Sequence, residues 1–271
     1  MRWIRQAPGR PAPERAMVKV RPRALPSVPD TPAANPNHLL AALSPDDYAR
    51  VRQSLEAVPL SLREILHRPG VGIDYVYFPG SGFCSVLAVL EDGRMIEVAT
   101  VGREGVVGTA AALDNMPSMH ATMVQAEIDP CFRMSVSAYQ AETNRRGAFY
   151  ELVSRFTQAL VGCVMQSAAC NAVHTVEQRL ARWLLMAHDR VEKQQFSLTQ
   201  EFAAMMLGVS RPTVSLVAAT LQKAGLITYQ RGLLTVVDRA GLEAASCECY
   251  WTATEMLQRA VTKGSRRPKR R

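Results

Sequence analysis

The side chains best suited to recognising another molecule lie between residues 197 and 225, in the stretch SLTQEFAAMMLGVSRPTVSLVAATLQKAG. Arg211 stands at the start of an expected helix, where a planar guanidinium group can donate two hydrogen bonds to one guanine edge. Lys223, near the end of that helix, is placed for a phosphate contact. These side chains predict a DNA-reading surface, made by Thr199, Ser210, Arg211, Pro212, Thr213, Ser215, Leu216 and Lys223.

The elements that must position these residues form an expected helix-turn-helix. Ser197 or Thr199 can cap the first helix, and Gly208 falls in the turn, where a positive φ is needed. Ser210 then caps the second helix, and Pro212 lies in its first turn, where a missing N–H costs nothing. One buried face of that helix is expected at the spacing i, i+3, i+4 and i+7, made by Val214, Val217, Ala218 and Leu221.

Two features decide between a DNA-binding domain and an ordinary helical hairpin. Small Ala204, which suits a close helix crossing, is followed four residues later by glycine and then by a capped amphipathic helix. Two expected short strands flank Gln230-Arg231-Gly232 and would form a wing. A helix-turn-helix with a wing is a winged helix, whose usual partner is double-stranded DNA. The pattern therefore favours the winged helix.

The preceding residues predict a β domain followed by a long helix. From about Leu60 to Met134, β-branched segments alternate with glycine-containing turns, which is typical of a sandwich or jelly roll. Residues 140–170 lack proline and repeat apolar side chains every three or four residues, which predicts an amphipathic helix. A break at Asn171–Thr175 predicts a hinge. We expect a dimer seam on this helix, rather than packing on its own domain alone, formed by Phe149, Leu152, Phe156, Leu160 and Cys163.

Composition and cysteine spacing exclude several other classes. The formal net charge is +8, but the excess of basic residues lies in segments 1–36 and 263–271, so charge alone does not indicate DNA binding. The six cysteines show no paired CxxC or zinc-finger spacing, so we expect free thiols in a reducing compartment and no metal ligands. Cys163 and Cys170 would share one helix face, where packing is favoured over a cross-chain disulfide. No apolar run approaches the ~18 residues of a membrane span, and no secretory signal is present, which predicts a cytoplasmic protein.

An enzyme is not expected. The sequence contains no nucleophile elbow, phosphate loop or zinc signature, and its five histidines are scattered. Proline-rich residues 1–36 are expected to be a disordered basic tail, and residues 251–271 the end of a helix followed by a second basic tail.

This order of parts resembles the Crp/Fnr family of bacterial transcriptional regulators. The resemblance rests on LTQEFAAMMLGVSRPTVSLVAATLQKAGLI at 198–227 and on YVYFPGSGFCSVLAVLEDGRMIEVATVGREGVVG at 75–108. It implies an α+β chain, with a cyclic-nucleotide-binding-like jelly roll at 37–139, a dimerisation helix at 140–171 and a winged helix-turn-helix at 172–250. It also implies a homodimer on a palindromic operator, and RNA polymerase is a further candidate partner.

Two departures from the family pattern bear on the effector and the operator. Thr109 and His120-Ala121 stand where cyclic-nucleotide binders place a glutamate and an Arg-Ser pair, which argues against cyclic AMP. No cysteine lies in residues 1–60, which excludes the family's N-terminal iron–sulfur cluster, so no cofactor is assigned. Pro212 and Leu216 replace charged reading residues, which predicts a different half-site. The candidate effector pocket is formed by Gly105, Gly108, Thr109, His120 and Ala121; the alternative is a ligand-independent regulator whose β domain only supports dimerisation.

Overall fold

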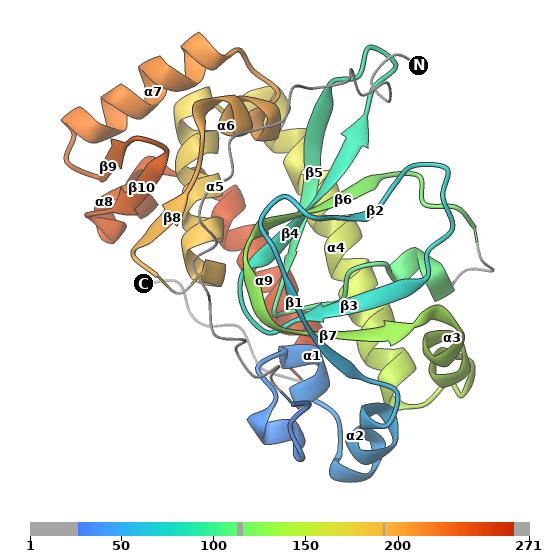
Figure 1. Ribbon diagram of the computed structural model, residues 1–271. Helices are drawn as coiled ribbons and strands as arrows, with labels where there is room; N and C mark the ends of the chain where they lie inside the picture. Colours follow the sequence, from blue (N-terminus) through green and yellow to red (C-terminus); the bar gives the residue numbers. More distant parts are fainter. Residues whose placement is uncertain (1–26, 113–115, 192, 263–271) are drawn as a thin grey trace, which may run out of the picture.

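The computed structural model describes residues 27–112, 116–191 and 193–262. Its N-terminal part is built from two antiparallel sheets that enclose an apolar core, as the jelly-roll prediction requires (Figure 1). Phe78, Cys84, Val101, Val124 and Phe132 are buried in that core. One sheet has the order β1 (Glu56–Leu60), β7 (Ile128–Ser135) and β3 (Tyr75–Pro79). The other has the order β2 (Ile65–His67), β6 (Ala121–Ala126), β4 (Phe83–Val89) and β5 (Met95–Gly102).

The β4–β5 hairpin carries the residues that later meet the C-terminal part. Gly93 occupies its turn at φ 86, a conformation that glycine adopts without steric penalty. Val86 pairs with Ala99 and Leu87 with Glu97, so the register shifts at Val98. This irregularity places Glu97 on the face of β5 that α5 covers.

Residues 27–36 are ordered, although the sequence predicts disorder up to residue 36. This stretch, which includes η1 (Pro32–Ala34), packs against α1 (His38–Ala41) and α2 (Pro45–Arg52). The carbonyl of Pro29 accepts hydrogen bonds from Tyr48 Oη at 2.8 Å and from Arg52 Nε at 2.9 Å. The predicted disorder of 1–36 is therefore wrong for 27–36, because buried side chains bind that stretch; residues 1–26 lie outside the described part.

The predicted single helix at 140–171 is two helices, α3 (Val136–Asn144) and α4 (Ala148–Val173). Arg146 separates them with a φ of 57, a left-handed conformation that no α-helix continues through. The predicted break at 171–175 is confirmed, because α4 ends at Val173 and α5 (Val176–Val191) begins after His174 and Thr175. The short η2 (Thr109–Ala112) completes the N-terminal part.

The residues of the predicted dimer seam pack inside the chain and do not form an exposed face for a second copy. Phe149, Leu152, Phe156 and Cys163 are buried within the chain itself, and Leu160 is partly buried against the same core. The ring of Phe156 packs so closely on Gly105 that a Cβ there would lie 2.0 Å from Cζ. Phe149, Leu152 and Phe156 pack in the core shared with the β domain, and Cys163 faces α9, so these four side chains are not available to a second copy.

A C-terminal helix that the sequence did not delimit packs along α4. After α8 (Arg239–Ala245), α9 (Cys249–Val261) runs beside α4 (Figure 1). Gly162 of α4 leaves room for Met256, whose Sδ would lie 2.9 Å from a Cβ at position 162. Cys163 points toward the carbonyl of Ala253, with its Sγ 3.9 Å away. Residues 251–262 are thus an integral part of the fold, and residues 263–271, the predicted basic tail, lie outside the described part.

Buried polar contacts join the N-terminal sheet to α5. Arg190 Nη2 lies 2.6 Å from Glu104 Oε1, and both side chains are largely buried. Glu97 accepts hydrogen bonds from Trp183 Nε1 at 2.8 Å and from Ser85 Oγ at 2.5 Å. Buried charges of this kind are costly unless they are paired, so they fix the position of α5 against β5.

A first prediction concerns Glu97. Burial raises the pKa of its carboxyl from the ordinary value of 4.5 to about 7, although the bonds from Ser85 and Trp183 oppose that rise. Between these two values the folded state binds the proton and the unfolded state does not. Glu97 therefore lowers stability as pH rises from about 4.5 to about 7, by up to roughly 3 kcal/mol, and has no further effect above that range.

The Glu97→Gln variant removes the titration and keeps both contacts, because its amide oxygen can accept from Trp183 Nε1 while its amide nitrogen donates to Ser85 Oγ. Its free energy of unfolding in urea, relative to the wild type, should rise between pH 5 and pH 7.5 and then stay level. Glu91→Gln, which removes an exposed carboxylate from the same hairpin, is the matched control and should leave the wild-type pH dependence unchanged. If the free energies of unfolding of wild type and Glu97→Gln changed in parallel between pH 5 and pH 7.5, the raised pKa of Glu97 would be contradicted.

Candidate nucleic-acid interface

The helix-turn-helix is formed by α6 (Gln200–Leu207) and α7 (Arg211–Lys223), and its capping follows the prediction. Thr199 Oγ1 accepts from the N–H of Phe202 at 3.2 Å, and Ser210 Oγ accepts from the N–H of Thr213 at 3.3 Å. Gly208 ends α6 in the left-handed conformation, with φ 64. Local sequence thus sets both helix starts and the turn between them.

The buried side of α7 holds the recognition helix against the rest of its domain. Val214, Ala218 and Leu221 are buried, as predicted, and Val217 is partly buried. Ser215 Oγ donates to Gln200 Oε1 at 2.6 Å, which ties α7 to α6. The guanidinium of Arg179, on α5, donates to the carbonyl of Leu207 at the end of α6. The orientation of α7 is therefore fixed through α6 to α5.

A three-stranded sheet forms the predicted wing. Its order is β8 (Gln195–Ser197), β10 (Leu233–Val236) and β9 (Ile227–Gln230), with the hairpin tip at 230–232. Arg231 at the tip has φ 51 and is exposed. Tyr229 Oη donates to the carbonyl of Leu198 at 2.8 Å and links the wing to the start of α6. Arg231 was not among the predicted contact residues, although a basic residue in the turn of a wing hairpin was a usable signal.

The eight predicted contact residues divide into two groups in the structure. Thr199, Ser210 and Ser215 are engaged in the caps and in the α6–α7 hydrogen bond, so they shape the surface, and Thr213 is partly buried beside Ser210. The remaining four project outward, and Leu216 is 70% exposed, which is unusual for a leucine. Figure 1 shows α7 at the edge of the molecule, with α6 between it and β5. The outward group is Arg211, Pro212, Leu216 and Lys223.

Arg211 is engaged within the domain by a carboxylate. Its Nε lies 2.8 Å from Glu201 Oε1 on α6, and both side chains are more than half exposed. An exposed pair of this kind contributes little, about 0–1 kcal/mol. The Arg211 guanidinium can therefore exchange Glu201 for a guanine edge at a small cost in free energy. Until then, the ion pair holds the guanidinium at the start of α7.

The predicted effector-pocket residues have different local surroundings in the described part of the chain. Gly105 is packed under Phe156, and its carbonyl accepts from Asn37 Nδ2 at 2.9 Å. Gly108 has φ 94 and lies against His67, while His120 is exposed on the chain before β6. Thr109 begins η2, and Ala121 is buried at the start of β6. Gly105, Gly108 and Ala121 thus have packing or turn roles, and an effector pocket at these positions stays a prediction.

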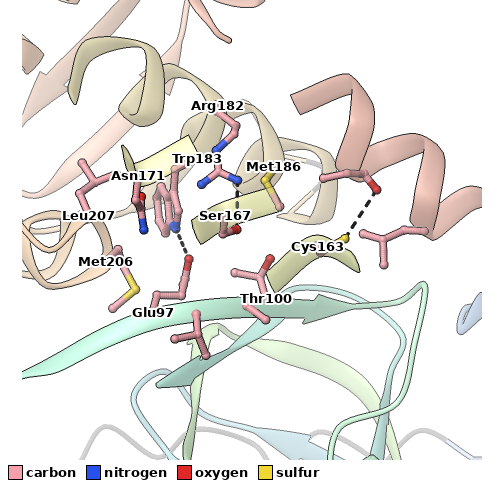
Figure 2. Close-up of a pocket in the computed structure, with 14 residues that line it drawn as sticks. Glu97, Thr100, Cys163, Ser167, Asn171, Arg182, Trp183, Met186, Met206 and Leu207 are labelled. Carbon is pink, nitrogen blue, oxygen red and sulfur yellow. Dashed lines mark hydrogen bonds between the residues drawn. The ribbon is translucent and has the colours of Figure 1, made fainter. Parts of the chain in front are cut away.

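A cavity lies between β5, α4, α5, α6 and α9 (Figure 2). Glu97, Thr100, Ser167 and Arg182 line it, and none of the predicted effector residues does. Arg182 Nη1 donates to Ser167 Oγ at 3.5 Å. Among the described residues, Thr100 Oγ1 and Arg182 Nε are buried without a hydrogen-bond partner, so this cavity offers polar groups that a bound water can satisfy.

One group of side chains in the described part of the chain has the composition of a metal site. It lies where α4 ends and α9 begins, and it consists of Cys170, His174, Cys247 and Cys249. The sequence shows it only as two short pairs, a cysteine four residues before a histidine and two cysteines separated by one residue. No single helix in the described ranges is long and apolar enough to cross a membrane.

Comparisons with known proteins agree with this architecture. Residues 178–245 match the family model described as the Crp-like helix-turn-helix domain. A CRP-family transcriptional regulator from Thermus thermophilus is 22% identical, with a TM-score of 0.58, over 70% of this chain and 96% of that one. The c-di-GMP-responsive global regulator CLP of Xanthomonas campestris is 16% identical, with a TM-score of 0.59, over 71% of this chain and 99% of that one. No match was found among the curated proteins.

These likenesses establish the fold and the kind of C-terminal domain. The solved structures share the jelly roll and the C-terminal helix-turn-helix with this chain at identities that indicate a common fold. Both of these solved proteins are named as regulators.

Proposed function

The chain is of the Crp/Fnr type in its fold and in its helix-turn-helix domain, and from that premise we propose that it regulates transcription by reading double-stranded DNA with α7. The observation that carries the proposal is the exposed start of α7. Ser210 caps this helix, its buried face is anchored on α5 and α6, and Arg211 and Leu216 project away from the molecule.

The outward side chains indicate what kind of half-site α7 would read. Arg211 can donate to the O6 and N7 atoms of one guanine, and this bidentate contact discriminates against other bases. Pro212 and Leu216 offer only apolar contact, which suits a thymine methyl group. Lys223 and Arg231 lie at the two edges of this surface and suit phosphate contacts that do not depend on sequence.

A homodimer is proposed on a different face of α4 from the predicted one. Apolar residues that are exposed recur along α4 at intervals of three and four, which is typical of a two-helix seam. Met165 is 67% exposed and lies near the middle of this stripe. A symmetric pairing there would bury the stripe and set the distance between the two α7 helices. The stripe consists of Val161, Val164, Met165, Ala168 and Ala172.

The placement of the predicted effector residues favours the ligand-independent alternative at that site. Gly105 is closed by Phe156, and His120 points to solvent, so neither is placed to hold a phosphate inside the roll. We therefore propose that the β domain supports α4 and α5 and that no cyclic nucleotide binds at the family's usual position. A contact with RNA polymerase stays a prediction of the family resemblance, and a cytoplasmic location stays a prediction of the sequence.

The second prediction tests DNA reading. Selection of bound sequences from random duplex DNA should yield a palindromic site with a guanine in each half. Arg211→Ala should lose about 1–3 kcal/mol of binding free energy, mainly by relaxing the preference at that one position. Equilibrium binding to the selected site and to single-base variants measures both quantities.

Lys223→Ala and Arg231→Ala are the matched controls. Each should weaken binding to all sequences alike and reduce the slope of log affinity against log salt by about 1. An Arg211→Ala protein that keeps the wild-type base preference would exclude Arg211 from base reading. Absence of any selected sequence would contradict the proposed function itself.

The third prediction tests the seam. Met165→Glu would place a charge in the buried stripe of the dimer, so the variant should sediment as a monomer and lose most of its operator affinity. Val71→Glu is the control, because Val71 is 53% exposed on a loop of the β domain. Sedimentation velocity at micromolar concentration should show a dimer for wild type and for Val71→Glu. A dimeric Met165→Glu protein would exclude this face.

A further inference from the structure

Three thiols and one imidazole converge at the base of the DNA-binding domain. Cys170 belongs to the last turn of α4, His174 follows its end, and Cys247 and Cys249 flank the start of α9. Their potential ligand atoms all lie within 4.8 Å of one another, and the three cysteines are buried. The three cysteines form a small buried cluster of their own, apart from the two large apolar cores.

We propose that Cys170, His174, Cys247 and Cys249 form a tetrahedral site for one structural Zn²⁺ ion. Three sulfur ligands and one imidazole are a set that proteins use for structural zinc, and such sites are closed by four protein ligands. The proposal does not depend on DNA binding, since it rests on the side chains alone.

The distances fit the edges of a zinc tetrahedron. With Zn–S of about 2.3 Å and Zn–N of about 2.0–2.1 Å, neighbouring ligand atoms lie about 3.5–3.8 Å apart. Cys170 Sγ and Cys247 Sγ are 3.5 Å apart, and Cys249 Sγ and His174 Nδ1 are 3.6 Å apart. The widest separation allowed within the group, 4.8 Å, closes with a shift of about half an ångström for each atom.

Neighbouring polar groups support the ligands as they do in zinc sites. His174 turns Nδ1 toward the thiols, while its Nε2 lies 3.3 Å from Glu248 Oε2. A proton on Nε2 can then be donated to the carboxylate, which leaves the Nδ1 lone pair for a metal. Gln166 Nε2 donates to Cys249 Sγ at 3.1 Å, a contact that stabilises a thiolate.

Other uses of the four residues fit less well. A disulfide between Cys170 and Cys247 would leave His174, Cys249 and their two supporting contacts without a role. An iron–sulfur cluster spreads its ligands over two or more irons and needs more room than a group within 4.8 Å provides. A single tetrahedral ion employs all four side chains.

The position of the site indicates what the ion would do. Residues 175–246, which hold α5, the helix-turn-helix, the wing and α8, lie between one ligand pair and the other. One ion would therefore join the chain entering this domain to the chain leaving it, and would hold the start of α9 against the end of α4. Loss of the ion should weaken the contact between the start of α9 and the end of α4 and lower the stability of the folded chain.

The fourth prediction tests the site on the full-length protein, purified under reducing conditions. Elemental analysis should give one zinc per chain. After removal of zinc by a chelator, titration with Co²⁺ should saturate at one equivalent, with the visible absorption of a tetrahedral thiolate complex, and Zn²⁺ should displace it. Removal of zinc should also lower the melting temperature.

Variants separate the site from the other cysteines. Cys247→Ser and His174→Ala should lose the stoichiometric zinc and the cobalt spectrum. Cys163→Ser, a buried α4 cysteine outside the cluster, should keep both. The cobalt titration of wild type needs no variant, so a folding defect in Cys247→Ser leaves the test intact. No tetrahedral spectrum in wild type, an unchanged spectrum in Cys247→Ser, or iron with acid-labile sulfide in the purified protein would overturn the proposal.

Discussion

The packing of α4 constrains the rest of the molecule, because this one helix contacts three different partners. Phe156 on its first face closes on Gly105 of the β domain, and Gly162 on its second face admits Met256 of α9. Its third face carries Met165 and other exposed apolar side chains, where we place the second copy. These three contacts explain why apolar side chains occur on more than one face of the helix.

This constraint also explains which parts of the fold follow from sequence and which do not. The helix-turn-helix is encoded by local signals, namely the caps at Thr199 and Ser210 and the left-handed Gly208, and each acts within a few residues. The face of α4 that meets a partner is a tertiary property. A periodic pattern shows that Phe149 and Phe156 share a face, but it does not distinguish the β domain from a second chain as the surface they cover.

The same argument applies to the candidate sites. The exposed residues of α7 could be predicted, because once the buried positions of a capped helix are known the remaining positions face outward. The hydrogen bond between Ser215 and Gln200 could not be predicted, because it depends on how α6 and α7 cross. The cysteine cluster was not predicted because its two pairs are joined only when α9 returns to α4, across the whole DNA-binding domain. The effector positions depend on a similar long-range contact, since the ring of Phe156, far along the chain, fills the space beside Gly105.

The buried polar contacts between the two parts determine position more than stability. Arg190 with Glu104 and Trp183 with Glu97 each need a matched partner on the other side, so a shift of α5 along β5 would leave a buried charge or donor unpaired. Apolar side chains alone would tolerate such a shift, because their contacts are not directional. The hydrogen bond from Arg179 of α5 to the end of α6 fixes α6 relative to α5, and the bond between Ser215 and Gln200 fixes α7 relative to α6. The orientation of the reading helix relative to the dimer face of α4 is therefore set by a chain of directional contacts, and a change in the charge of Glu97 acts at the start of that chain.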